Sequence, residues 1–276
     1  MIVARSNPDA HAVADHYNEL DPFYRALWGE HVHHGLWITG NEPPETAVEA
    51  LSDRVSNLLD PMPGDRLVDI GCGYGATARR IAQARSAEIT GLTLSVMQAS
   101  YAPAHPGVNL LVRDWLDNGL AAGTFDHGYA IESTEHMVDK PRFFAEAARV
   151  LKPGGRLVVC AWLAESNASV RRVRYLLEPI CHEGRLPSMG TREDYECWAN
   201  EAGLLSIGYQ DVSRQVARTW TICIGRFARA VLTDRNTRSR VMASRNRLFV
   251  FSLPRLILAY RCGAMRYGIF TWYKPD

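Results

Sequence analysis

The sequence lacks long apolar segments, a secretory leader pattern and closely spaced cysteines. Its longest apolar stretch, residues 248–260, is interrupted by Pro254 and Arg255 and is shorter than the roughly 18 residues of a membrane span. Polar and acidic side chains break up the first 15 residues, unlike a leader peptide. The six cysteines are widely separated, which disfavours a disulfide framework and a zinc site. We therefore expect a cytoplasmic protein with reduced thiols and no transmembrane span.

Neither sign of charge is in excess over the whole chain, since the formal net charge is +1. The charges are unevenly distributed, however, because positions 213–276 contain thirteen basic and two acidic residues. This basic C-terminal region suits an anionic substrate or peripheral contact with an anionic membrane, although solvated arginine faces on amphipathic helices are the simpler explanation. No nucleic-acid-binding motif accompanies the charge, so we expect no nucleic-acid partner. The oligomeric state stays open.

The most informative segment is Val-Asp-Ile-Gly-Cys-Gly-Tyr-Gly-Ala at positions 68–76. Residues 67–70 predict a short buried strand, and residues 76–84 predict the helix that follows it. Between them, three glycines permit a tight turn and the close approach of a ligand. Dinucleotide-binding proteins use the same strand-turn-helix geometry, so this motif alone does not decide which cofactor is bound.

The second predicted strand, residues 88–92, argues against a nicotinamide cofactor. A nicotinamide-binding unit usually carries an acidic residue about 20 residues after its glycine turn, where it holds the ribose hydroxyls. Here the strand continues into Thr-Leu-Ser at 93–95, with no carboxylate. A nicotinamide-dependent oxidoreductase therefore remains only an alternative, beside a non-catalytic cofactor-binding protein.

Four further segments follow in a characteristic order. They are Gly-Leu-Thr-Leu-Ser-Val-Met-Gln at 91–98, Arg-Asp-Trp at 113–115, Glu-Ser-Thr-Glu-His-Met at 132–137 and Leu-Lys-Pro-Gly-Gly at 151–155. With the glycine motif, they resemble the class I S-adenosylmethionine-dependent methyltransferases. The segment at 91–98 resembles the subgroup that contains tocopherol methyltransferases and cyclopropane fatty acid synthases.

The resemblance implies an α/β, Rossmann-like fold with a seven-stranded, mostly parallel sheet flanked by helices. We expect an N-terminal helical lid over residues 1–47, the S-adenosylmethionine-binding core over 48–164, and a helical cap with the last sheet strands over 165–276, all within one integrated domain. The expected helices span 8–20, 43–59, 140–151, 167–182, 192–202, 219–232 and 240–262. The expected later strands span 156–162, 205–212 and 267–273.

The resemblance also implies S-adenosyl-L-methionine as cofactor, S-adenosyl-L-homocysteine as its product, and a set of cofactor-binding residues. Thr93 and Gln98 take over polar recognition of the cofactor, Asp114 accepts from the adenine amino group, and Trp115 covers the ring unless it is simply a core residue. The full set is Tyr17, Asp69, Gly71, Gly73, Gly75, Thr93, Leu94, Gln98, Asp114 and Trp115.

Glu132 and His136 are the candidate catalytic residues, because polar groups at the carboxyl end of a central strand lie in the ligand crevice. Methyl transfer requires in-line alignment of donor and acceptor, exclusion of water and, for some acceptors, removal of a proton. A histidine is suited to take that proton, and a carboxylate is suited to orient the acceptor or stabilise positive charge. Glu135 could replace Glu132.

The segment 31–37, His-Val-His-His-Gly-Leu-Trp, contains three histidines in four residues. Alternation sends His31 and His33 to one side and His34 to the other, which disfavours a metal site, and we assign no metal. By resemblance this segment lies over the cofactor and lines the acceptor pocket. The candidate substrate-binding residues are His34, Trp37, Tyr175 and Trp220.

These residues imply a small, largely apolar acceptor, aromatic, alkaloid-like or isoprenoid, methylated by in-line transfer. An alternative is a prenyl diphosphate C-methyltransferase, because Glu-Ser-Thr at 132–134 resembles the active-site segment of such enzymes. That activity would need a magnesium site, which the sequence does not locate.

Overall fold

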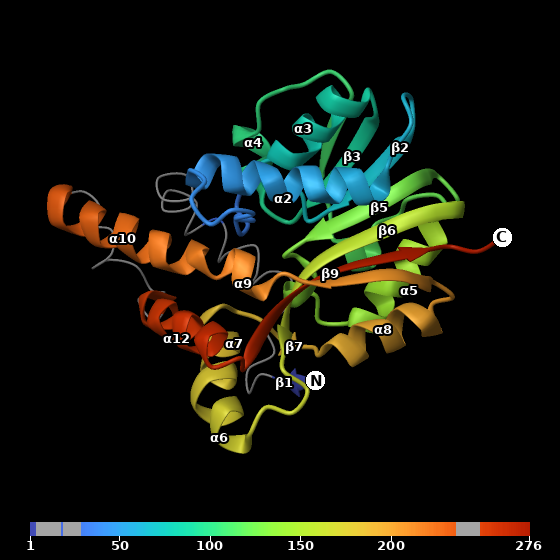
Figure 1. Cartoon of the computed structure of the whole chain (residues 1–276). Helices are drawn as coiled ribbons and strands as arrows, with labels where there is room; N and C mark the ends of the chain where they lie inside the picture. Colours follow the sequence, from blue (N-terminus) through green and yellow to red (C-terminus); the bar gives the residue numbers. More distant parts are fainter. Residues whose placement is uncertain (4–17, 19–28, 236–248) are drawn as a thin grey trace.

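The computed structural model describes residues 1–3, 18, 29–235 and 249–276, and its centre is a seven-stranded sheet (Figure 1). The strand order is β4-β3-β2-β5-β6-β9-β8. All neighbouring strands from β4 to β6 are parallel, whereas β9 runs antiparallel to both β6 and β8. The strands are β2 (Arg66–Ile70), β3 (Glu88–Thr93), β4 (Val108–Val112), β5 (Phe125–Ile131), β6 (Leu151–Ala164), β8 (Leu205–Asp211) and β9 (Met265–Tyr273).

Helices cover both faces of this sheet. In Figure 1, α2 (Pro44–Leu59), α3 (Ala76–Arg85) and α4 (Val96–Tyr101) lie on one side, and α5 (Lys140–Val150) and α8 (Arg192–Glu201) lie on the other. Short 3-10 turns, η1 (Trp115–Asp117) and η2 (Thr134–His136), follow β4 and β5. The α9 helix (Ser213–Val216) follows β8.

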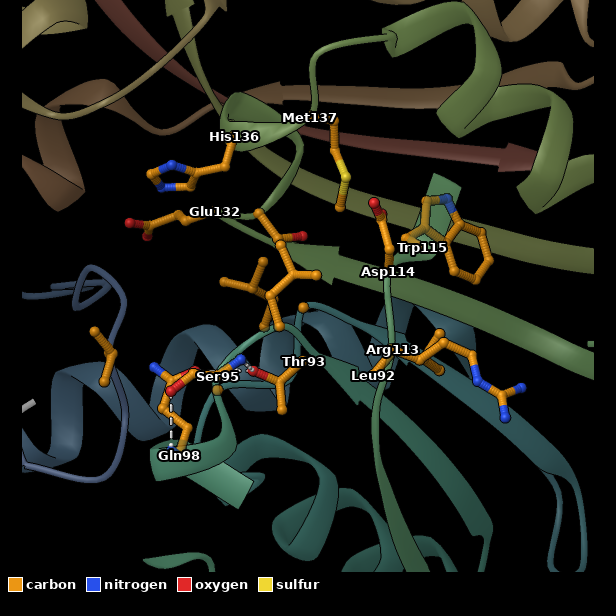
Figure 2. A pocket seen from close by; sticks show the side chains of 16 residues that line it. Leu92, Thr93, Ser95, Gln98, Arg113, Asp114, Trp115, Glu132, His136 and Met137 are labelled. Carbon is orange, nitrogen blue, oxygen red and sulfur yellow. Dashed lines mark hydrogen bonds between the residues drawn. The ribbon is translucent and has the colours of Figure 1, made fainter. Parts of the chain in front are cut away.

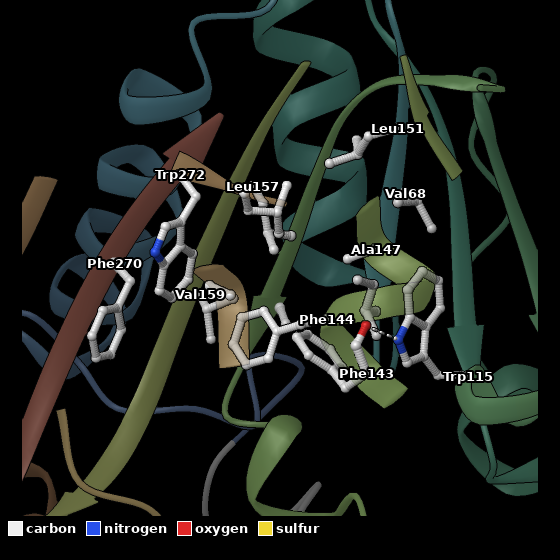
Figure 3. Close-up of a cluster of buried hydrophobic side chains, with 14 of the residues drawn as sticks. Val68, Trp115, Phe143, Phe144, Ala147, Leu151, Leu157, Val159, Phe270 and Trp272 are labelled. Carbon is white, nitrogen blue, oxygen red and sulfur yellow. Dashed lines mark hydrogen bonds between the residues drawn. The ribbon is translucent and has the colours of Figure 1, made fainter. Parts of the chain in front are cut away.

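Two buried cores form because successive strand residues point to opposite faces of the sheet. On β2, for example, Val68 belongs to the core beneath α5 and α8, whereas Leu67 belongs to the core beneath α2 and α3. Figure 3 shows the first core, in which Phe144 lies among aromatic rings. Its ring centroid is 5.0 Å from that of Phe143 and 5.3 Å from that of Trp272. Burial on both faces explains the nearly continuous apolar sequence of the central strands.

A third core holds the cap, by which we mean α6 (Val170–Arg172), the π-helical turn η3 (Val173–Leu177), α7 (Glu178–Glu183), α10 (Arg218–Thr233) and α12 (Phe249–Arg261). Leu177, Trp220 and Leu256 are among its buried side chains. A small antiparallel pair, β1 (Ile2–Val3) with β7 (Ser188–Met189), lies beside it. None of the helices in the described part of the chain is both long and apolar enough to cross a membrane.

The seven-stranded, mostly parallel sheet with flanking helices confirms the predicted fold, and the structure shows all six cysteines as free thiols. Two local predictions were wrong. The expected helix over 167–182 is divided into α6, η3 and α7, and the strand expected from residue 156 begins at Leu151. Leu151 pairs with Phe125 before a register shift, so the Lys-Pro-Gly-Gly segment is accommodated within an irregular strand. The helix predicted over 8–20 lies outside the described residues except for residue 18. Residues 240–248 of the helix predicted over 240–262 lie outside them too.

The packing around Phe144 predicts a large loss of stability on truncation. Phe144→Ala is expected to lower the free energy of unfolding by about 3–5 kcal/mol, because the cavity left between α5 and the sheet cannot close. Urea denaturation measures this. The control Val170→Ala changes a side chain that is 82% exposed and should shift the free energy by less than about 0.5 kcal/mol. Equal effects of the two variants would contradict the assignment of this core.

Candidate cofactor and active site

One cavity is lined by residues at the carboxyl ends of four neighbouring strands, β2, β3, β4 and β5 (Figure 2). It encloses about 700 Å³, part of which is open to solvent. Its walls are Val32, Gly71, Gly73, Leu92, Thr93, Leu94, Ser95, Gln98, Arg113, Asp114, Trp115, Ile131, Glu132, Ser133, His136 and Met137.

The three glycines of the turn after β2 are needed for different physical reasons. A Cβ on Gly71 would lie 2.3 Å from the Cβ of Ser133, so this glycine permits close packing of two backbone segments. A Cβ on Gly73 would meet only the Nε2 of Gln98, at 3.9 Å, and would otherwise project into the cavity. Gly75 has a φ of 68° and is the N-cap residue of α3. Gly73 is therefore the glycine whose missing side chain leaves room for a ligand.

Hydroxyl and amide groups fix the wall formed after β3. The Thr93 hydroxyl donates to the Oε1 of Gln98 at 3.0 Å, and the Ser95 side chain accepts from the Gln98 backbone N–H at 3.1 Å. Because the Gln98 oxygen is occupied, its Nε2 donors lie on the side of Gly73. The structure thus brings the predicted residues Thr93, Leu94 and Gln98 into one wall.

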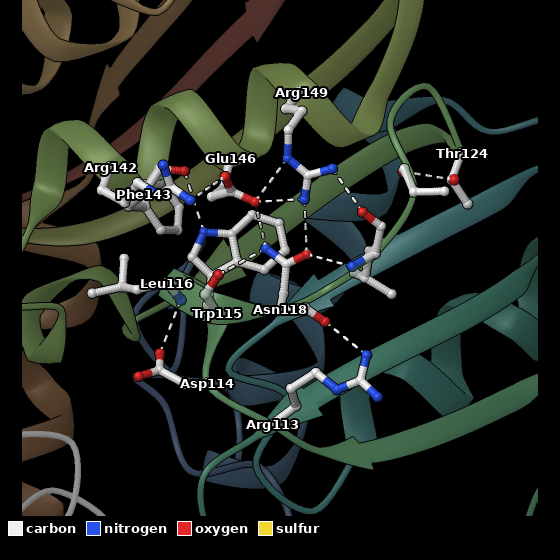
Figure 4. A network of polar contacts seen from close by, with 12 residues as sticks. Arg113, Asp114, Trp115, Leu116, Asn118, Thr124, Arg142, Phe143, Glu146 and Arg149 are labelled. Carbon is white, nitrogen blue, oxygen red and sulfur yellow. Dashed lines mark hydrogen bonds and ion pairs between the residues drawn. The ribbon is translucent and has the colours of Figure 1, made fainter.

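The wall formed after β4 is held rigid by a buried polar network (Figure 4). Asp114 accepts from the Leu116 backbone N–H through Oδ1, and the Trp115 indole donates to the Phe143 carbonyl oxygen. Asn118, 1% exposed, donates to the Trp115 carbonyl oxygen and to Glu146. Trp115 is therefore both a core residue and part of the cavity wall.

Glu132, directly after β5, is a buried carboxylate with four donors. It accepts from the His34 backbone N–H at 2.7 Å and from the His34 Nδ1 at 2.9 Å. It also accepts from the Trp162 indole at 3.0 Å and from the Tyr267 hydroxyl at 2.7 Å. Burial acts to raise the pKa of Glu132, but the charge and hydrogen bonds of His34 outweigh it and hold the pKa at about 2. Its φ of 53° is unusual for a residue with a side chain and is sustained by these contacts.

His136 lies in the cavity wall beside Glu132, on the 3-10 turn η2, and Figure 2 shows both side chains on the same side of the view. Burial lowers the pKa of His136 to about 4, against a hydrogen bond to the Arg185 backbone, which raises it. The ring is therefore neutral near pH 7. Glu135 does not line this cavity, because its carboxylate accepts from the Trp162 backbone N–H and the Thr134 hydroxyl.

A smaller pocket of about 340 Å³ adjoins the cavity and shares Val32, Gly71, Gly73 and Ile131 with it. Asp69 lies here, where it accepts from the Tyr129 hydroxyl at 2.9 Å, and burial raises its pKa to about 7. His31 and His33 also line it, with His31 Nδ1 3.2 Å from His33 Nε2, whereas His34 faces Glu132. The predicted alternation of these histidines is thus confirmed.

The four candidate substrate residues are not brought together in the cavity wall. His34 and Trp220 lie behind it, packed ring to ring with centroids 5.0 Å apart. Trp37 is buried elsewhere and donates to the Glu42 carbonyl oxygen. Tyr175 is 63% exposed, because η3 turns Leu177 toward the cap core and leaves Tyr175 outside. None of these four residues is part of this wall, their role toward a substrate stays a prediction, and Tyr17 lies outside the described residues.

Sequence reasoning missed the groups that hold Glu132 and the turn. The Ser133 hydroxyl donates to the Ile70 carbonyl oxygen at 2.5 Å and so ties η2 to the strand before the glycine turn. Trp162 and Tyr267 come from neighbouring strands, β6 and β9, whose pairing places Trp162 opposite Tyr267. Only the sheet order reveals that both side chains converge on Glu132.

The residues of the cavity fit an S-adenosylmethionine cofactor. The space beside Gly73 would be filled by a Cβ, the Gln98 amide nitrogen borders that space, and the Asp114 Oδ2 remains an acceptor at the opposite wall. The walls between these polar groups are largely apolar, as expected for a site that surrounds an adenosyl group.

This geometry predicts which glycine substitution abolishes cofactor binding. Gly73→Val is expected to weaken S-adenosylmethionine binding at least about a hundredfold, because the side chain would occupy the cavity. Gly123→Val is the matched control, since Gly123 has a similar φ of 60°, nothing within 4 Å, and no place in the cavity wall. Calorimetric titration measures binding. Comparable losses in both variants would show that backbone strain, rather than cavity filling, is responsible.

Curated proteins of similar sequence are methyltransferases. A chloroplastic tocopherol O-methyltransferase from Arabidopsis thaliana is 29% identical, covering 95% of this chain and 82% of that protein. A 27-O-demethylrifamycin SV methyltransferase from Amycolatopsis mediterranei is 32% identical, covering 80% of this chain and 84% of that protein.

The cyclopropane synthase MmaA2 from Mycobacterium tuberculosis has a similar solved structure, with a TM-score of 0.85 over 98% of this chain and 100% of that one, at 22% identity. The sequence profile of the mycolic acid cyclopropane synthetase family matches residues 4–245. These findings favour S-adenosylmethionine, the sulfonium cofactor, over the nicotinamide alternative. The chain belongs to the mycolic acid cyclopropane synthetase family, and it is an S-adenosylmethionine-dependent methyltransferase of class I fold.

Proposed function

We propose that the enzyme methylates a small, largely apolar acceptor, which is aromatic, alkaloid-like or isoprenoid. The observation that carries this proposal is the cavity itself, whose wall joins the glycine turn to Glu132 and His136 through apolar side chains such as Ile131 and Met137. Two relatives support it, because both are named for small-molecule acceptors, a tocopherol and a rifamycin. The cofactor supplies an electrophilic methyl group, and the protein must align the acceptor with it and exclude water.

In the proposed mechanism, Glu132 orients the acceptor, and His136 receives the proton that the acceptor loses. Four donors and a pKa of about 2 keep Glu132 ionised and fixed, so it is suited to electrostatic positioning rather than to proton removal. His136 is neutral and its orientation is fixed by the Arg185 backbone, so its ring is a proton acceptor at the cavity. As a weak base, it suits an acceptor whose acidity rises while the new bond to carbon forms.

The alternative is that the enzyme is a prenyl diphosphate C-methyltransferase, with a prenyl diphosphate as its acceptor. Within the described parts of the chain, no cluster of three or more His, Cys, Asp or Glu side chains is arranged to hold a metal ion. An assay with labelled S-adenosylmethionine should therefore offer phenols, secondary amines, and geranyl diphosphate with and without magnesium. Methylation of geranyl diphosphate alone would replace the proposal by this alternative.

The cytoplasmic location stays a prediction, and the plant relative is chloroplastic.

His136→Ala is expected to retain cofactor affinity within about twofold and to lose about 100-fold or more in turnover, the usual contribution of a general base. Calorimetric titration and initial rates with a responding acceptor separate the two effects. His105→Ala is the control, because His105 is half-buried outside the cavity wall and its ring bonds to the carbonyl oxygen of its neighbour Pro106. Unchanged turnover in His136→Ala would remove this residue from the mechanism.

The lowered pKa of His136 predicts the pH profile. A general base must be unprotonated, and a pKa of about 4 keeps this ring unprotonated above pH 5. We therefore expect kcat/KM to show no limb from His136 between pH 6 and 8 and to fall only as the pH drops toward 4. A limb near pH 6.5 that disappears in His136→Ala would show that the ring titrates as an ordinary histidine.

A further inference from the structure

The 3-10 turn that carries His136 is tied to neighbouring elements at several points. Its residues bond to four of them: Ser133 to Ile70 on β2, Thr134 to Tyr195 on α8, Glu135 to Trp162 on β6, and Met137 to Lys140 at the start of α5. His136 and Met137 themselves line the cavity. The position of the His136 ring therefore depends on what holds this turn.

Lys140 is a buried lysine whose ammonium group bonds to both the turn and β7. Its side chain is 2% exposed, and its Nζ donates to the Met137 carbonyl oxygen at 3.1 Å. The Nζ also donates to the Ser188 hydroxyl at 2.7 Å and to the Ser188 carbonyl oxygen at 3.3 Å. An ammonium group has three donors and no acceptor, so these contacts satisfy it. Lys140 thus ties the end of the turn to β7, beside the cap.

The connection from α7 to β7, residues 184–187, meets the turn at a second point. Burial lowers the pKa of His136, whereas a hydrogen bond to the Arg185 backbone acts to raise it, so the ring is the donor and the carbonyl oxygen is the acceptor. A neutral imidazole that donates through one nitrogen carries its lone pair on the other. The bond to Arg185 therefore fixes the tautomer in which the second nitrogen can accept a proton.

Packing holds this connection in a conformation that its backbone disfavours. Arg185 has a φ of 55°, in the left-handed region that a residue with a side chain rarely adopts. The next residue, Leu186, is 2% exposed in the cap core, and its N–H donates to the Cys181 carbonyl oxygen at 2.8 Å. Such strain persists only where the surroundings enforce it. The Arg185 carbonyl group is therefore held relative to the cap.

We propose that Lys140 is a positioning residue for methyl transfer, because it ties the end of the turn to Ser188 and so keeps the His136 ring against the Arg185 carbonyl oxygen. Lys140 does not line the cavity, so it acts through His136 rather than by contact with the cofactor or the acceptor. The lone pair of the second ring nitrogen takes the proton that the acceptor loses as its bond to the methyl carbon forms. The inference rests on the proposed role of His136 as the proton acceptor.

The Lys140 ammonium also acts on His136 through its charge. Burial is the main cause that lowers the pKa of His136, and the positive charge of Lys140 lowers it further, against the charge of Glu132. Lys140 itself is faced by the Glu135 carboxylate and the Cys181 thiol, and burial lowers its pKa to about 8. The ammonium form therefore prevails at pH 7. Removing this charge should raise the pKa of His136, an effect that distinguishes Lys140 from a purely structural residue.

The first test needs no acceptor. NMR spectra of the whole chain with isotope-labelled histidine report the tautomer and the pKa of His136, whose signals are those missing from His136→Ala. In Lys140→Met we expect this pKa to rise by about 0.5 or more and the preference for one tautomer to weaken. Lys274→Met is the matched control, because the Lys274 Nζ donates to the Leu151 carbonyl oxygen at 2.8 Å, outside the cavity wall. An unchanged His136 spectrum in Lys140→Met, or an equal change in Lys274→Met, would overturn the inference.

The second test is a double-mutant cycle on turnover. Initial rates use whichever of the phenols, secondary amines or geranyl diphosphate the labelled assay identifies as acceptor. Lys140→Met is expected to lower kcat about tenfold and to leave S-adenosylmethionine affinity within about twofold, because only the base is misplaced. In the His136→Ala background the same change should have almost no further effect, and an equal loss there would overturn the inference. If His136→Ala alone keeps full turnover, the proposed function fails, and the first test still decides whether Lys140 positions the ring.

Ser188→Ala tests the same tie in a milder way. It removes one of the three acceptors of Lys140 and leaves the ammonium charge in place. We expect kcat to fall about threefold and the tautomer preference of His136 to weaken, while its pKa stays almost unchanged. If circular dichroism shows that Lys140→Met does not fold, unchanged turnover and an unchanged tautomer preference in Ser188→Ala would overturn the inference.

Discussion

The site depends on one buried carboxylate, Glu132, and on the donors that surround it. Removing an ionised group from water is costly unless hydrogen bonds replace the lost hydration, and four donors do so here. The same contacts sustain a backbone conformation that a non-glycine residue rarely adopts. They also link the His-His-Gly segment, β6 and β9 to the end of β5. The cavity wall and the rest of the fold are therefore coupled at this residue.

The order of the strands determines which groups share the cavity. β2, β3, β4 and β5 are parallel neighbours, so their carboxyl ends lie at one edge of the sheet. Each contributes a different function: the glycine turn, the Thr93–Gln98 pair, Asp114 with Trp115, and Glu132 with the following turn. Buried networks behind them, such as Asn118 with Glu146 and Arg149, hold the walls without entering the cavity. The walls on the cofactor side are thus cross-linked by hydrogen bonds.

Electrostatics give the two ends of the cavity different characters. Arg113 and Asp114 lie side by side at one end, and burial keeps His136 neutral at the other. Glu135 shows how strongly position matters, because it is only three residues from Glu132 and burial, with the neighbouring Glu132 charge, raises its pKa to about 7. The His34 ring beside Glu132, which has no counterpart beside Glu135 among the described residues, explains the difference between the pKa values of the two carboxylates. Sequence alone cannot distinguish them, since both are glutamates at the end of the same strand.

The sequence by itself determined the fold class, the cofactor and most of the cofactor wall. Strand periodicity, the glycine turn and the polar residues that end each strand are local features, and parallel strands bring such ends together whatever the loops do. It could not place Trp37, Tyr175 or Trp220, because the burial of an aromatic side chain depends on which elements pack around it. Only the tertiary structure decided that His34, Trp162 and Tyr267 converge on Glu132. That convergence depends on contacts between residues more than 90 positions apart, or across β6 and β9, and no local pattern encodes them.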